Sequence, residues 1–105
     1  MSIFGTLFKK KPSNQDFCKK LDNRKLQYVI ERLPDGEIVV GKSGYINIKN
    51  SEMIIFCEGK TIFRSDINKT ECADLMSLAG VIINGFDIET QLQRTLVAYY
   101  LYYRK

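Results

Sequence analysis

Residues 45–64 read YINIKNSEMIIFCEGKTIFR, and this stretch decides the fold. Its first part, Tyr45–Lys49, alternates polar and apolar side chains, as a strand with one buried face does. An Asn-Ser pair then interrupts the pattern, and the apolar run Glu52–Glu58 follows. A Gly-Lys pair makes a two-residue connection of the hairpin type before Thr61–Arg64. The stretch therefore predicts three short antiparallel strands joined by tight turns.

Further strand patterns flank this stretch on both sides. A Pro-Asp-Gly turn at residues 34–36 separates the first two, because Pro presets φ and Gly accepts a positive φ. The further predicted strands are Gln27–Leu33, Glu37–Gly41, residues 71–76, Gly80–Gly85 and, after a longer turn at Phe86–Gln93, Arg94–Tyr103. Residues 70–80 also show helical spacing of apolar side chains, so that segment could be a strand or a helix. Seven or eight short strands in series predict a small antiparallel, partly open barrel or sandwich.

The segment before the strands has a different composition. Ser13 can cap a helix that carries Asp16 near its N-terminus, and apolar side chains recur at helical spacing over residues 14–24. We therefore expect a short amphipathic α-helix that packs on the β-rich body. The chain divides into a basic leader over residues 1–12 and a single β-rich domain over residues 13–105, a size that fits one domain.

Charge and cysteine content narrow the class of protein. The formal net charge is +4, but the excess lies in residues 1–25, whereas residues 26–105 carry nine basic and ten acidic side chains. A phosphate-binding surface usually needs a basic stripe on the folded body, so nucleic acid is a disfavoured partner. The three cysteines, an odd number without a C-x-x-C pair, indicate a reducing, cytoplasmic location.

The leader is the only segment that suggests a membrane. No apolar run approaches the ~20 residues that span a bilayer, so no transmembrane segment is expected. Ile3, Phe4, Leu7 and Phe8 would share one helical face, and three lysines follow them. This pattern is typical of a short interfacial anchor, although a segment that packs on its own domain or frays is the simpler explanation.

One motif resembles a nucleotide-binding loop. Gly36–Ser43 reads GEIVVGKS and satisfies G-x-x-x-x-G-K-S. A phosphate loop must follow a strand, keep its N–H groups unpaired and open a helix at its Lys-Ser end. Here the intervening residues favour a strand, and a further strand pattern follows. We therefore interpret the match as part of a hairpin and predict no bound cofactor.

The sequence contains few residues that could form a catalytic or metal-binding site. The chain contains no histidine, which removes the usual general base near neutral pH and the usual partner of a nucleophile. The carboxylates that could act as acids or bases are Asp66, Asp74, Asp87 and Glu89. Nothing in the sequence pairs two of them, and the scattered cysteines lack the spacing of a zinc site. We therefore expect no catalytic residues, no metal and no enzymatic activity.

The C-terminal run YYLYYRK carries the candidate binding residues. Tyr99 and Tyr103 would face one side of a strand, and Tyr100 and Tyr102 the other. Aromatic side chains on both faces mean that the strand is covered twice or that one face meets a partner. Tyrosine suits such half-hydrated surfaces, although stacking with nucleic-acid bases beside the basic C-terminus is an alternative.

A family resemblance lies in the second half of the chain, over about residues 45–105. Its residues are Phe63-Arg64, the segment MSLAGVIINGFD at residues 76–87 and RTLVAYY at residues 94–100. These resemble an uncharacterised group of small bacterial proteins, and the series of short strands is similar to that of bacterial PH-like domains. The resemblance implies a bent sheet that closes into a partly open barrel and serves as a binding platform.

Two departures limit what the resemblance implies. PH-like domains end in a helix that plugs the barrel, whereas this chain ends in a predicted strand. The body also lacks the clustered Lys/Arg loop with which lipid-binding members hold phosphoinositides, so no functional residue carries over. The sequence predicts a non-enzymatic protein-binding or self-associating module, with single-stranded nucleic-acid binding or membrane-surface attachment as alternatives.

Overall fold

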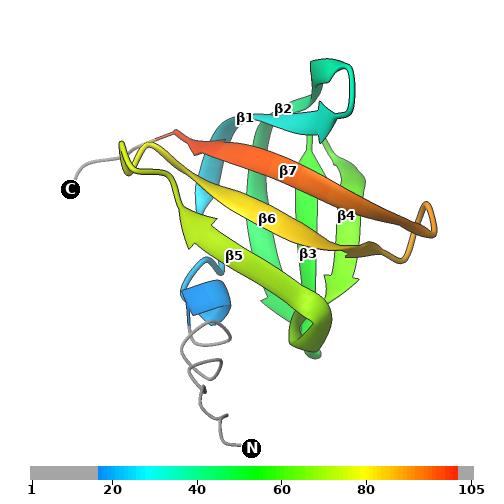
Figure 1. Cartoon of the computed structure of the whole chain (residues 1–105). Helices are drawn as coiled ribbons and strands as arrows, with labels where there is room; N and C mark the ends of the chain where they lie inside the picture. The colour runs from blue at the N-terminus through cyan, green and yellow to red at the C-terminus, as the bar shows by residue number, and fades with distance from the viewer. Residues whose placement is uncertain (1–16, 102–105) are drawn as a thin grey trace, which may run out of the picture.

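Seven antiparallel strands form one sheet in the computed structural model of this chain, which describes residues 17–101 (Figure 1). The order across the sheet is β4-β3-β2-β1-β7-β6-β5. The strands are β1 (Lys25–Leu33), β2 (Gly36–Lys49), β3 (Glu52–Cys57), β4 (Lys60–Asp66), β5 (Thr70–Asp74), β6 (Gly80–Asp87) and β7 (Leu92–Tyr100), and the 3-10 helix η2 (Ile67–Lys69) joins β4 to β5. β1 and β7 therefore meet at the centre, although they stand at opposite ends of the strand series.

The sheet curls into a half-barrel, as predicted. Its β4 edge approaches the turn after β6, where the N–H of Ile88 donates to the carbonyl of Arg64 at 2.7 Å. The N–H of Arg64 donates in turn to Oδ1 of Asp87 at 3.2 Å. Because these bonds join β4 to the far half of the sheet, they hold the curl closed at that corner.

The turn at Asn50-Ser51 lies where it was predicted. The turn predicted at Gly59-Lys60 lies one residue earlier, because Lys60 already pairs with Cys57. Asn50 and Ser51, between β2 and β3, have φ values of 54° and 64°. Glu58 and Gly59, between β3 and β4, have φ values of 53° and 81°. Two consecutive positive φ values match the right-handed twist of the strands that such a hairpin joins.

The predicted strands Glu37–Gly41 and Tyr45–Lys49 prove to be one continuous strand, β2. The prediction of a break between them was wrong because Gly44 continues the pairing. A side chain at Gly44 would overlap with the carbonyl oxygen of Phe56 on β3, so only glycine lets the two backbones approach there. The sequence GEIVVGKS lies inside this strand, which confirms that the apparent phosphate loop is part of a hairpin.

Other strand boundaries differ from the predictions as well: β1 begins at Lys25 and not at Gln27, and β4 runs over Lys60–Asp66 and not Thr61–Arg64. Residues 70–80 form a strand only over Thr70–Asp74 and then turn, and the helical alternative for this segment was wrong. β6 runs on to Asp87, so the turn before β7 shortens to residues 88–91. The last strand begins at Leu92 and ends at Tyr100, because pairing with β6 starts at Asp87 and pairing with β1 ends at Leu26.

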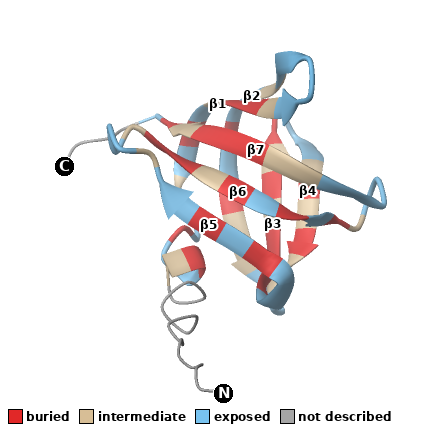
Figure 2. Ribbon diagram, in the orientation of Figure 1, coloured by how far each residue is buried: buried red, intermediate tan, exposed pale blue. Residues whose placement is uncertain are grey.

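A single apolar core fills the inside of the curl (Figure 2). It draws one side chain in two from most strands, with Phe63, Ile55, Met53 and Leu96 among the fully buried members. Within the described part of the helix predicted over residues 14–24, only residues 17–19 are helical and the chain turns from residue 20. This segment adds Cys18 and Leu21 to the core, as expected. The leader over residues 1–12 lies outside the described residues.

No helix within residues 17–101 is long and apolar enough to cross a membrane.

Candidate binding surface on the outer face

The outer face of β1 and β7 carries a second, smaller apolar layer. Ile30 and Val97 lie opposite each other in the β1–β7 ladder and have exposed fractions of 8% and 0%. Neither belongs to the core inside the curl. A convex sheet face that met only water would leave such side chains exposed, so this face is covered by its own neighbours.

Two tyrosines from these strands form a ring pair on that face. Tyr28 lies opposite Tyr99 in the ladder, and their ring centroids are 4.8 Å apart with planes inclined by 32°. Aromatic pairs of this geometry contribute about 0.5–1.5 kcal/mol beyond the area they bury. Both rings are half-buried, so part of each remains accessible to solvent.

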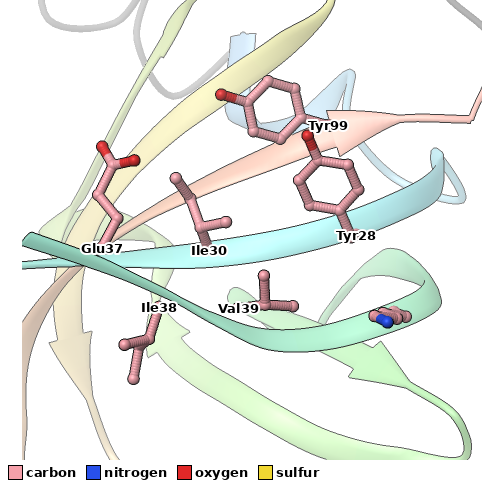
Figure 3. Close-up of a pocket in the computed structure, with 7 residues that line it drawn as sticks. Tyr28, Ile30, Glu37, Ile38, Val39 and Tyr99 are labelled. Atoms are coloured by element: carbon pink, nitrogen blue, oxygen red, sulfur yellow. The ribbon is translucent and has the colours of Figure 1, made fainter.

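A hollow of about 490 Å³ opens beside this tyrosine pair (Figure 3). Its lining residues are Tyr28, Ile30, Glu37, Ile38, Val39, Lys42 and Tyr99. Figure 3 shows Val39 on the same side of its strand as the tyrosine rings, whereas Ile38 points to the other side. Val39 is 54% exposed, although it lies beside this covered apolar layer. We call this hollow and its lining the outer groove.

The outer groove has one acidic and one basic side chain at its margin. Glu37 is half exposed and forms an ion pair with Arg32, with an Nε–Oε2 distance of 3.3 Å. Lys42 stands opposite Tyr28 in the β1–β2 ladder and is exposed. An apolar floor with a few polar groups at its rim is the usual composition of a binding pocket.

The structure separates the predicted tyrosines. Tyr99 belongs to the outer groove, but Tyr100 points into the core and is 3% exposed. The hydroxyl of Tyr100 donates to Oδ1 of Asp74 at 3.3 Å, and the Arg24 guanidinium lies 3.7 Å from the ring centroid. Burial and the nearby Asp74 carboxylate raise the pKa of Tyr100 to about 12. Tyr102 and Tyr103 lie outside the described residues.

Sequence reasoning missed Tyr28, Ile30 and Val39. The signal was present in the run Tyr28-Val29-Ile30, which places apolar side chains on both faces of β1 just as Tyr99 and Tyr100 do on β7. Two strands that are apolar on both faces will cover each other when they are neighbours. Neither segment by itself indicates that β1 and β7 are neighbours, because this depends on the order of the strands in the sheet.

The four candidate carboxylates each have a partner in the fold. Asp66 accepts from the N–H of Asn68 at 2.9 Å at the start of η2. Glu89 pairs with Arg64, with a distance of 2.9 Å between Oε2 and Nη1. Asp74 accepts from Tyr100, and Asp87 lies in a buried ion network. These contacts are those of residues that stabilise the fold.

The buried network centres on Arg94. Its Nη1 lies 2.6 Å from Oδ2 of Asp87, and its Nη2 lies 2.8 Å from Oε1 of Glu31. Burial by itself raises the pKa of Asp87, but hydrogen bonds from Arg94, from Thr90 and from two backbone N–H groups outweigh it and leave that pKa lowered. Asp87 is therefore held as a carboxylate, which suits an ion pair and not a general acid.

Within residues 17–101, no group of three or more cysteine, aspartate or glutamate side chains is arranged to hold a metal ion.

Comparison with known proteins returns no match: no family model, no curated protein and no solved structure is similar to this chain at a significant level.

Proposed function

We propose that this chain is a non-enzymatic protein-binding module that holds a partner, or a second copy of itself, at the outer groove. The tyrosine pair beside the exposed Val39 is the observation that carries the proposal. Aromatic side chains are enriched at the centres of protein interfaces, where they bury a large area and lose little conformational entropy.

The size and the margin of the groove support a peptide side chain as its occupant. A volume of about 490 Å³ lies within the range of pockets that enclose a ligand, roughly 300–1,000 Å³. Glu37 and Lys42 at the rim can each form an ion pair or a hydrogen bond with a partner. The floor, formed by Ile30 and the two rings, offers apolar contact but no nucleophile or general base.

The charge balance supports a protein partner over a nucleic acid. Residues 17–101 carry eleven basic and eleven acidic side chains, so the described body has no excess of positive charge. Phosphate binding depends on neutralisation by Lys and Arg, and each contact makes the affinity fall with salt. One lysine beside the tyrosines does not supply a path along a phosphate backbone.

The proposed location and attachment follow from the sequence. We place the module in the cytoplasm because its cysteine content fits a reducing compartment. The likeness to PH-like binding platforms stays a prediction. A membrane-surface contact through Ile3, Phe4, Leu7 and Phe8 also stays a prediction, and these residues lie outside the described part of the chain.

Photo-crosslinking tests the proposal directly. The full chain would carry p-benzoylphenylalanine at position 39 or at position 45 and be irradiated in cells of its source. Tyr45 is the matched control, because it is 40% exposed and stacks on Phe56 at 5.0 Å on another part of the sheet. We expect a discrete protein adduct from position 39 only, and its loss when Tyr99→Glu is added.

Two results would contradict the proposal. Equal adducts from both positions would mean unspecific contact, and no adduct at position 39 in a folded protein would mean that the groove is empty. Light scattering of the purified chain and of Val39→Glu separates self-association from a foreign partner. A single-stranded oligonucleotide bound at low salt and released by Tyr99→Glu would instead support the nucleic-acid alternative.

A further inference from the structure

Two cysteines far apart in sequence meet at the lower end of the half-barrel. Cys18 lies on the helical turn and Cys72 on β5, and their sulfur atoms are 3.0 Å apart although 54 residues separate them. Cys18 is fully buried, and Cys72 is 9% exposed. A disulfide bond measures about 2.05 Å, so an approach of about 1 Å would bring the two sulfurs to bonding distance.

The contact makes the two thiols chemically unequal. The hydrogen bond between the two sulfur atoms lowers the pKa of Cys18. The same hydrogen bond, together with burial, raises the pKa of Cys72. A thiolate is the nucleophilic form of cysteine, so Cys18 is the sulfur that attacks the oxidant, and Cys72 is the neighbour that can complete the reaction.

Residues 17–24, which include Cys18, cross the end of the half-barrel, and we call this segment the strap. Its far side is fixed to β2, where the N–H of Asn23 donates to the carbonyl of Ile46 at 2.6 Å. Oδ1 of Asp22 accepts from the N–H of Ile48 at 2.7 Å. Its near side meets β5, the edge strand, which pairs only with β6 in the described sheet. Figure 1 shows the helical turn lying beneath β5.

We propose that Cys18 and Cys72 form a dithiol site that a hydroperoxide oxidises to an intramolecular disulfide. The Cys18 thiolate attacks the O–O bond of hydrogen peroxide, forms a sulfenic acid and releases hydroxide, which takes a proton to become water. The Cys72 sulfur then attacks the sulfenic sulfur, forms the S–S bond and displaces a second water as its own proton leaves. Two thiols and one peroxide thus give one disulfide and two molecules of water.

The Cys18–Cys72 disulfide would link the strap covalently to the edge strand β5. A crosslink between residues 54 positions apart removes conformational freedom from the unfolded chain, so the oxidised protein should be more stable than the reduced one. For a domain of this size the expected rise in Tm is on the order of 10 °C. In a reducing compartment such a bond would be transient, as cytosolic redox-sensing disulfides are.

Thiol counting with peptide mapping tests the site. The reduced full chain is treated with one equivalent of hydrogen peroxide, unfolded in guanidinium with N-ethylmaleimide, and analysed by mass spectrometry. We expect the number of alkylated cysteines to fall from three to one, with a peptide pair that joins Cys18 to Cys72. Dithiothreitol should restore all three thiols and reverse the rise in Tm.

Cys57 provides the matched control. It is 3% exposed at the end of β3, and burial raises the pKa of its thiol. Cys57→Ser should lose both remaining thiols to peroxide, whereas Cys18→Ser and Cys72→Ser should form no intramolecular disulfide and show no rise in Tm. Retention of all three thiols in the folded wild-type chain would overturn the proposal, and so would a bond that includes Cys57 or links two chains. The wild-type peptide map decides the matter even if a variant does not fold.

Discussion

Tyr99 and Tyr100 are adjacent on β7 and have opposite surroundings. Tyr99 lies on the outer face, half-buried against Tyr28, and borders the outer groove. Tyr100 lies on the inner face, 3% exposed, with its hydroxyl on Asp74. Every second side chain of β7 therefore packs in the core inside the half-barrel. The side chains between them form a thin apolar layer on the outer face, where a partner could reach them.

The largest expected difference in unfolding free energy is between a substitution at Arg94, on the inner face of β7, and one at its neighbour Thr95, on the outer face. Arg94→Leu would leave the carboxylates of Asp87 and Glu31 without their cation, and Asp87 is fully buried. Removal of one member of a buried ion pair costs about 3–5 kcal/mol of unfolding free energy. Urea denaturation at pH 7 measures it. Thr95→Val should change the stability by less than about 0.5 kcal/mol, and equal effects would refute the contrast.

A smaller difference is expected between Leu96 and Val97, both of which are fully buried. Leu96→Ala would open a cavity in the core and lower the free energy of unfolding by about 2–5 kcal/mol. Val97→Ala removes two methyl groups from the thin outer layer, which should cost about 1–2 kcal/mol. Chemical denaturation of both variants gives the comparison. A Val97 variant that is as unstable as the Leu96 variant would mean that the outer face is a second core.

The stability contribution of Tyr100 should depend on alkaline pH. The folded state raises the pKa of Tyr100 to about 12, above the value of about 10 in an unfolded chain. The stability that comes from the neutral phenol is therefore complete below pH 10 and is lost as the pH rises through 12. Denaturation midpoints between pH 9 and pH 12 should fall in the wild type and in Tyr99→Phe. They should fall less steeply in Tyr100→Phe, and an unchanged slope there would exclude this assignment.

A substitution at Val39 should have the smallest effect on stability, but it should abolish partner binding. Val39 is 54% exposed, so Val39→Glu should shift the free energy of unfolding by less than about 0.5 kcal/mol. The same change places a charge against the tyrosine pair and should abolish binding of the partner that the crosslink from position 39 identifies. A partner that still binds this variant with unchanged affinity would place the interface elsewhere.

Most of the strand pattern was predictable because its causes are local. Alternation in Tyr45–Lys49 and the turn residues at 34–36 and 50–51 act through the backbone of a few neighbouring residues. The boundaries were less accurate at β2 and β7. Gly44 continues a strand only because β3 lies against it, and β7 begins at Leu92 only because Asp87 is there to pair with it.

The candidate site was predictable only in part, for the same reason. Tyrosine alternation along the last strand correctly placed Tyr99 and Tyr100 on opposite faces, but it could not say which face was inside. That choice depends on the curl of the whole sheet and on the strands that flank β7. Tyr28 and Val39 entered the groove through strand order and register, which have no signature in either segment by itself.

The sequence by itself therefore determined an antiparallel β domain with a short helix before it, and it ruled out a phosphate loop at Gly36–Ser43. Tertiary structure alone decided the pairing of β1 with β7 and the contact between Cys18 and Cys72. The physical reason is the range of the forces involved. Alternation and turn chemistry are fixed within a few residues, whereas contacts across 54 or 71 positions exist only after the apolar faces have collapsed on one another.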